Sequence, residues 1–457
     1  MKKISLQSKN VIENIVGAFI VKGGSLIISV ILLPLYLRFF QNQEILGIWY
    51  TILSVLNWVV LFDLGLGQGL RNQLPKALAK NDKIMAKEYI STTYILMTGV
   101  VVIVTIGGII LLRSINLYSI FNVDETILNY ADLEKSVIIV FIGIMIQIVL
   151  KIVTSILYAM QKSAVVNMLA LLTNIIILGA LYIIPSKDIT TNLITMSWVN
   201  VIAANIPYIF CTIWVFQKTE LKGTAPSLRA FSKNYIANIF NVGISLLWLQ
   251  IVFMVVSSTN EFLISNFTSP KYVVEYQAYY KVFKTAAMVM SLALTPIWSA
   301  VTKAQIEQNY KWIKKVYYIF LALSGLCFVG EICLIPILQW GMNLWLGSGV
   351  IDVKVSYAFV FVMSSVSFVL HNVNTSIGNG LSYFKLQMIW MTIAAVVFIP
   401  LSWGFVKLFG GWIGVVFASV IAMLPYEVLA PIFTIKKINN LEKYNDATKH
   451  NCIFQRN

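Results

Sequence analysis

The sequence predicts an all-α integral membrane protein with about twelve transmembrane helices in two six-helix bundles around a central cavity. Hydrophobic residues make up 58% of the 457 residues, and charged residues only 12%. That charged share is about half of what a soluble domain carries. The apolar residues come in runs long enough to cross a bilayer as helices. Basic residues also gather in alternate loops, as they do in multi-pass membrane proteins.

Each apolar window of bilayer length is one expected helix, and the windows follow one another along the whole chain. Only a few residues separate the fourth window from the fifth, which predicts a tight helical hairpin there. The twelve expected helices lie at 14–37, 46–68, 89–112, 136–159, 163–184, 192–216, 238–266, 272–300, 316–338, 355–378, 386–408 and 412–434.

The loops predict the orientation of these helices. With the N-terminus in the cytoplasm, the cytoplasmic segments hold twenty-three of the 34 lysines and arginines, and the outer loops hold seven. Because positive residues accumulate on the cytoplasmic side of membrane proteins, this bias favours an even number of spans with both termini in the cytoplasm.

Two similar stretches indicate an internal repeat. Leu157-Tyr-Ala-Met-Gln-Lys162 leads into the fifth helix, and Asn379-Gly-Leu-Ser-Tyr-Phe-Lys385 leads into the eleventh, about half the chain later. An even number of helices per half makes the repeats parallel, with a cavity between two bundles that rock during alternating access. We expect a first bundle at 1–216, a cytoplasmic linker at 217–235, a second bundle at 236–435 and a cytoplasmic polar tail at 436–457.

Composition and spacing exclude several classes of function. The net charge of +15 is spread thinly over short loops, so no nucleic-acid partner is expected. The four cysteines have no metal-ligand spacing, and no cofactor or metal site is expected. The sequence shows no catalytic nucleophile, nucleotide motif or large polar loop, so we expect a protein that is not an enzyme.

Four lysines interrupt apolar windows: Lys22, Lys151, Lys281 and Lys284. A charge at the bilayer centre costs roughly 2.5–3.5 kcal/mol on insertion scales, and such residues usually face a bundle interior or a wet cavity. These lysines therefore indicate a transporter with an anionic cargo. The alternatives are a lysine that extends to the headgroups and a lysine that is paired with a buried acid.

Lys281 and Lys284 lie three residues apart and so share one face of a helix. Two like charges on a dry face repel each other, and an anionic cargo, water or a nearby acid would relieve this. Tyr276, Tyr279 and Tyr280 offer another interpretation, an interfacial aromatic belt that would leave Lys281 close to the membrane surface.

Two sequence stretches resemble a known family. The second window and its exit contain Leu46-Gly-Ile-Trp-Tyr50, Phe62-Asp-Leu-Gly-Leu-Gly67 and Leu70-Arg-Asn72. The seventh and eighth windows contain Asn260-Glu-Phe-Leu-Ile-Ser265 and Tyr276 through Lys281. This pattern resembles the bacterial polysaccharide-unit flippases (O-antigen and capsule type) of the multidrug/oligosaccharidyl-lipid/polysaccharide exporter superfamily. The carboxylate expected at position 260 stands one residue later, at Glu261.

The resemblance implies an activity, a cargo and a location. Such flippases turn oligosaccharide repeat units on undecaprenyl diphosphate from the inner to the outer leaflet of the bacterial cytoplasmic membrane. The partners would be this lipid-linked glycan, membrane lipids and a coupling ion, either proton or sodium. Lysines that neutralise a diphosphate fit this cargo. The expected substrate-binding residues are Lys22, Lys151, Lys281, Lys284 and Arg71, although Arg71 also fits ordinary cytoplasmic charge.

The acids and one histidine within the windows are candidates for ion coupling. A buried carboxyl group readily holds a proton, and each of these acids could equally balance a lysine. Asp63 also fits a structural role at the inner end of its helix. The candidates are Asp63, Glu261, Glu331, Glu427 and His371.

Two other transport functions remain open. A multidrug or small-molecule antiporter of the same superfamily would carry organic cations, which the four lysines disfavour. A flippase for peptidoglycan lipid precursors usually has two further helices at the C-terminus.

Overall fold

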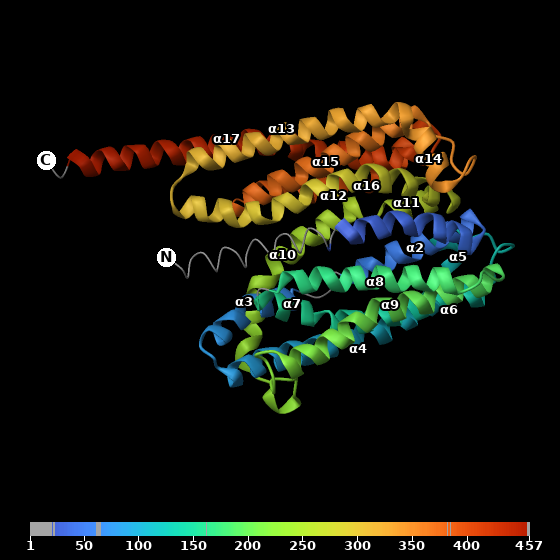
Figure 1. The fold of residues 1–457 in the computed structure, drawn as a ribbon, viewed down its shortest axis with the longest axis horizontal. Helices are drawn as coiled ribbons and strands as arrows, with labels where there is room; N and C mark the ends of the chain where they lie inside the picture. The colour runs from blue at the N-terminus through green and yellow to red at the C-terminus, as the bar shows by residue number, and fades with distance from the viewer. Residues whose placement is uncertain are drawn as a thin grey trace. The chain divides into compact units, whose positions relative to one another are not determined.

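The computed structural model describes residues 21–454 except for 22, 61–64, 161, 382 and 384 (Figure 1). Helices and short 3-10 turns are the regular elements of this part of the chain. The helices before the central linker are Gly23–Phe40, α2 (Gln43–Val60), α3 (Leu66–Ala79), α4 (Lys83–Ser114), α5 (Leu117–Phe121), α6 (Tyr130–Leu150), α7 (Ile152–Ala159), α8 (Ser163–Ile183) and α9 (Ile189–Lys218).

The elements after α9 begin with two 3-10 turns. They are η1 (Leu228–Ala230), η2 (Lys233–Tyr235), α10 (Ile236–Ser257), α11 (Asn260–Phe267), α12 (Lys271–Ile306), α13 (Tyr310–Leu334), η3 (Ile335–Ile337), α14 (Leu338–Leu346), α15 (Val355–Gly380), α16 (Lys385–Phe409) and α17 (Ile413–Phe454).

The helices present apolar surface that only a membrane would cover. Among the described residues, nine helices are long and apolar enough to cross a membrane, and α10 with α11 forms a tenth candidate bent by 42°. On α4, for example, Ile103, Ile106 and Ile110 are 73%, 58% and 62% exposed. A water-facing stripe of this kind would be unstable, so the chain is a multi-pass membrane protein.

The predicted fold class is confirmed. All twelve expected windows overlap a helix or a broken helix of the described chain. Two of these windows are not among the ten apolar spans. One is 46–68, which α2 and α3 share, and the other is 272–300, where α12 carries Lys281 and Lys284. The expected hairpin is also found, since α7 ends at Ala159 and α8 begins at Ser163.

The chain divides into two compact units. The first comprises Met1–Met254 and Ile264–Val274, and the second comprises Val255–Leu263 and Glu275–Asn457. Most of α10 therefore belongs to the first unit by its contacts. The predicted domain division at 217–235 stays a prediction.

In the first unit, glycines lie where the backbone requires them. Gly65, in the motif that follows α2, has a φ of 72° and precedes the first residue of α3. This left-handed conformation is disfavoured for residues with a side chain, so glycine allows the turn into α3. Gly47 of α2 packs directly against the backbone of Pro270.

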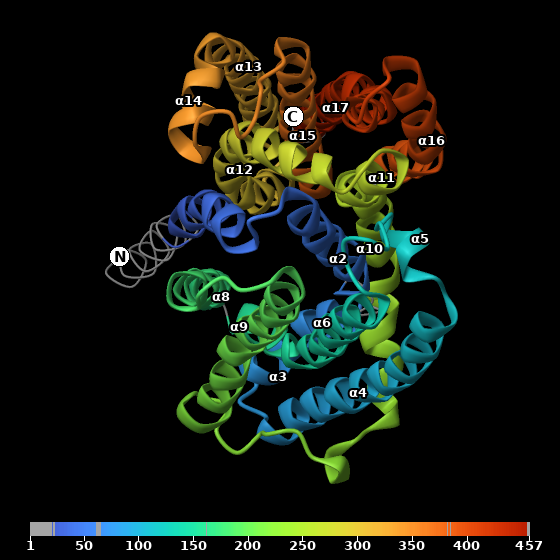
Figure 2. The ribbon, with the colours of Figure 1, turned by 90° about the vertical axis from the view of Figure 1, so that its right-hand side faces the viewer.

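In the second unit, Figure 2 shows α12, α13, α15, α16 and α17 gathered in one bundle. One end of its core is an aromatic layer in which Tyr279 stacks on Phe361 at 5.2 Å and Trp412 lies 6.2 Å from Tyr279. Further along, aliphatic side chains of α12, α13 and α15 pack around Tyr317. Close packing of this kind fixes how the helices of the second unit are aligned along one another. The polar side chains described below lie between these helices.

The last helix is longer than the predicted span. The apolar window ends at residue 434, but α17 continues as one helix to Phe454. The segment after Pro431 contains neither proline nor glycine, so nothing in its sequence stops the helix. The predicted polar tail is therefore helical over most of its length.

Candidate functional site

The second unit contains a group of charged side chains around Lys284, which is itself half-buried. Lys284 lies about 20 Å along α12 from its first residue, at 1.5 Å per residue. Its Nζ atom lies 3.8 Å from the centroid of the Phe368 ring on α15. It is also within electrostatic range of Glu331, Glu427 and His371. Four of the predicted site residues are thus brought together by α12, α13, α15 and α17.

The carboxyl groups of Glu331 and Glu427 each accept a hydrogen bond from a serine of α15, and the two serines are two residues apart. Glu331 of α13 is 2% exposed, and Ser365 Oγ donates to its Oε1 at 2.6 Å. Glu427 of α17 is 5% exposed, and Ser367 Oγ donates to its Oε1. The Oε2 atom of Glu331 has no hydrogen-bond partner among the described residues, so this carboxyl is only half satisfied.

Ser365 has a second acceptor within reach. Its Oγ lies 3.1 Å from the carbonyl oxygen of Phe283 on α12. A hydroxyl has one hydrogen to donate and lone pairs to accept with. Ser365 can therefore donate to a charged Glu331, or accept from a protonated Glu331 while it donates to Phe283. The site can hold this carboxyl group in either protonation state with the same heavy-atom positions.

His371 connects this group to a second set of polar side chains. It is 3% exposed, its Nε2 lies 3.5 Å from Thr375 Oγ1, and its ring centroid lies 5.5 Å from that of Tyr426. Gln387 of α16 donates to Thr375 Oγ1 at 3.1 Å. The polar groups therefore form a path that continues from α17 through α15 to α16.

The charges in this group do not form close pairs. Within the described chain, Lys284 makes no direct ion pair with Glu331 or Glu427. Buried charges without close partners are costly to maintain for stability alone. An ammonium and two carboxyl groups in one bundle can take up or release a proton, and this is the chemistry that the site offers.

Lys281 lies one turn before Lys284 on α12, half-buried, and its carbonyl oxygen accepts from Thr285 Oγ1. Tyr276 and Tyr279 are 2% and 0% exposed in the aromatic layer. Their rings are buried because they pack inside the bundle, and Lys281 follows this layer directly.

The other predicted residues lie elsewhere. Glu261 of α11 accepts from Gln277 Nε2 at 2.9 Å. Lys151 is exposed at the break between α6 and α7. Arg71 of α3 is exposed, and its guanidinium carbon lies 4.3 Å from the ring centroid of Tyr158. Lys22 and Asp63 lie outside the described residues.

Sequence reasoning missed the uncharged partners of this site. Three of them contact its charged or titratable groups: Ser365, Ser367 and Thr375. The fourth is Asn374, whose Oδ1 accepts from the Tyr317 hydroxyl at 2.6 Å. Ser367, His371, Asn374 and Thr375 recur at three- and four-residue steps along α15. That periodicity was the available signal, because it places polar groups on faces that the bundle buries.

Comparisons with known proteins find similarity in structure. No protein-family model matches the chain, and no curated protein sequence matches it. An inward-facing multidrug resistance MATE family transporter of the MOP superfamily is 14% identical, with a TM-score of 0.76 over 93% of this chain and 99% of that chain. An outward-facing one is 15% identical, with a TM-score of 0.61 over 94% and 96%.

A third similar structure differs in its described pocket. A MOP superfamily transporter from Pyrococcus furiosus, reported with a binding pocket of reverse polarity that suggests a different function, is 16% identical. Its TM-score is 0.61 over 94% of this chain and 96% of that chain. At such low identity the matches show the fold alone. The chain has the all-α, two-bundle fold of the MATE family transporters of the MOP superfamily.

Proposed function

We propose that the chain is an exporter that works by alternating access in the bacterial cytoplasmic membrane, with both termini in the cytoplasm. The fold supports this, because it matches transporters described in inward-facing and outward-facing conformations. The loop charges support the orientation.

We propose further that its cargo is an oligosaccharide repeat unit on undecaprenyl diphosphate, turned from the inner to the outer leaflet. The observation that carries this proposal is Lys281, a half-buried lysine within the apolar run of α12. A lysine is a compact, strongly hydrated charge, and placing it in a membrane helix is costly unless an anion or water meets it. The resemblance of the Gly47 and Gly65 motifs to polysaccharide-unit flippases supports the same cargo.

The two lysines have different roles in this proposal. Lys284 lies with Glu331 and Glu427, so its charge is balanced within the bundle and belongs to ion coupling. Lys281 is not part of the group that Glu331 and Glu427 form with their serines. In this proposal it binds the diphosphate, together with Lys22, Lys151 and Arg71. Glu261 and Asp63 stay further candidates for coupling.

Replacement of Lys281 tests the cargo. In cells that depend on this protein for a surface glycan, Lys281→Ala should lower export about tenfold, the loss of one charged hydrogen bond to a phosphate. Lipid-linked repeat units should accumulate on the inner leaflet, and Lys281→Arg should restore most of the export. Surface glycan and inner-leaflet intermediate are measured at matched protein levels.

The matched control is Lys187→Ala, which removes an exposed loop lysine and should leave export unchanged. Normal export with Lys281→Ala and Lys22→Ala combined would end the anionic-cargo proposal.

A multidrug antiporter is the second candidate. The similar structures include multidrug resistance transporters, and Glu331 and Glu427 could hold an organic cation as well as a proton. Expression in a drug-sensitive strain separates the two functions. A rise in the inhibitory concentration of cationic drugs that Glu427→Gln abolishes, without any glycan phenotype, would favour the antiporter.

A further inference from the structure

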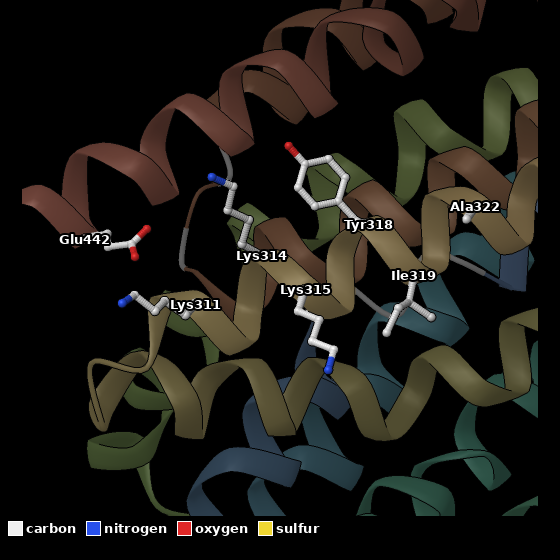
Figure 3. Close-up of a pocket in the computed structure, with 7 residues that line it drawn as sticks. All are labelled: Lys311, Lys314, Lys315, Tyr318, Ile319, Ala322 and Glu442. Atoms are coloured by element: carbon white, nitrogen blue, oxygen red, sulfur yellow. The ribbon is translucent and has the colours of Figure 1, made fainter.

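A groove between α13 and α17 lies outside the site described above. Figure 3 shows it lined at one end by Lys311, Lys314 and Lys315 of α13 and by Glu442 of α17. Its volume is about 580 Å³. The end of the bundle that carries these lysines is the end that the loop charges assign to the cytoplasm.

The groove has more positive charge than its own acid can balance. Lys311 and Lys315 are four residues apart on one helix face, where like charges destabilise each other. Figure 3 shows the Glu442 carboxylate facing the Lys311 ammonium. Lys314 Nζ donates to Asn439 Oδ1 of α17 at 2.8 Å, which holds a third ammonium at the groove. Three ammonium groups and one carboxylate leave a net positive site that an anion would complete.

Below the lysines the groove becomes apolar and continues onto the outer face of α13. Tyr318 and Ile319 are 48% and 47% exposed, and Ala322 is exposed beside them. Leu323 and Leu326, further along the same helix, are 40% and 66% exposed. Charged groups at one end and a continuous apolar strip at the other match the two ends of a phospholipid.

We propose that this groove binds an anionic phospholipid of the inner leaflet. Its phosphate lies between Lys311 and Lys315, and its acyl chains run along Ile319 and Ala322 toward Leu326. Basic recesses beside membrane helices attract anionic headgroups in this way, at a strength that falls within one Debye length. The apolar strip selects a lipid over a free phosphate, because only a lipid has chains to cover it.

Lipid binding to the full-length protein tests this proposal. In phosphatidylcholine nanodiscs, titrated phosphatidylglycerol should bind the wild type and raise its melting temperature. Lys311→Gln combined with Lys315→Gln should weaken the binding about 30-fold, from two lysine–headgroup interactions. Glu442→Gln should tighten it, because the competing carboxylate is gone. Native mass spectrometry counts the retained lipids.

Two further variants separate a built site from surface charge. Lys311→Arg combined with Lys315→Arg keeps both charges and should bind the lipid like the wild type. Such binding also shows that a protein changed at both positions still folds. Lys218→Gln with Lys222→Gln removes two exposed lysines at the end of α9 and should change nothing. Equal weakening by this control pair would overturn the proposal in favour of bulk surface charge.

The choice of ligand separates the sources of phosphate. Inorganic phosphate at the same concentration should give no stabilisation, and equal stabilisation by it would overturn the role of the apolar strip. If undecaprenyl diphosphate displaces phosphatidylglycerol from the groove at much lower concentration, the proposal that the groove binds a phospholipid is overturned. None of these measurements depends on transport, so failure here leaves the proposed function untouched.

Discussion

At the scale of single residues, Gly47 shows what a sequence motif means in space. Built onto its backbone, a Cβ atom would lie 1.8 Å from the Pro270 carbonyl oxygen and 2.4 Å from the Pro270 carbonyl carbon. Main-chain atoms cannot move aside as a flexible side chain can. Gly47 therefore lets α2 meet the segment that precedes α12, and this explains a glycine between the large apolar residues Leu46 and Ile48.

Gly47→Ala should destabilise the protein by about 3 kcal/mol, at the upper end of the usual cost of overpacking. The melting temperature in detergent measures this. The control is Gly107→Ala on α4, where no heavy atom lies within 4 Å of the added methyl group. Similar melting temperatures for the two variants would contradict the close contact at Gly47.

At the scale of elements, the helix breaks are set by a few residues. Apolar windows predicted the helices, but 46–68 is not one straight helix: α2 ends at Val60, and α3 begins at Leu66 after Gly65. Lys151 separates α6 from α7 within another predicted window. Hydropathy measures how well a stretch dissolves in lipid and carries no information on bends, so these breaks could be placed only through local residues such as glycine.

Gly65→Ala should lower stability by about 1–2 kcal/mol, because its φ of 72° is unfavourable for alanine. Gly65→Asn should lose less, since asparagine adopts the left-handed conformation more readily. Thermal unfolding of the two variants beside the wild type gives the order. An alanine variant as stable as the asparagine one would contradict a strained turn before α3.

At the scale of the whole molecule, the chain keeps ionisable groups inside the bundle that a merely stable protein would lack. Glu331, Glu427 and Lys284 lie there together, and Ser365 can serve Glu331 in either of its protonation states. We infer that this group couples transport to an ion gradient. Burying these ionisable groups costs stability, and ion coupling would be the reason that the protein keeps them.

Glu331→Gln should uncouple transport while it preserves the fold, because glutamine keeps the shape but cannot release a proton. In proteoliposomes, transport driven by an imposed proton or sodium gradient should fall to the level seen without a gradient, while exchange down the cargo's own gradient continues. Glu220→Gln, at an exposed position after α9, is the control. Gradient-driven transport that survives both Glu331→Gln and Glu427→Gln would contradict this coupling.

The sequence predicted the helices, and it singled out four charged or titratable residues that the second unit groups together. Lys284, Glu331, Glu427 and His371 stood out because charge in an apolar window is conspicuous. Their grouping did not follow from sequence, since it depends on the rotation of four helices about their axes. Ser365 could not be singled out either, because a serine in a membrane helix usually bonds its own backbone.

The length of α17 has a mechanical consequence. Its 42 residues span about 63 Å, roughly twice the thickness of the hydrocarbon layer. A long helix magnifies rotation, and Pro425 and Pro431 are places where this one can bend. A tilt of about 10° displaces a position about 30 Å along the helix by about 5 Å. A probe attached at Lys443 would thus register rearrangements of the second unit that stay below detection at Glu427 on the same helix.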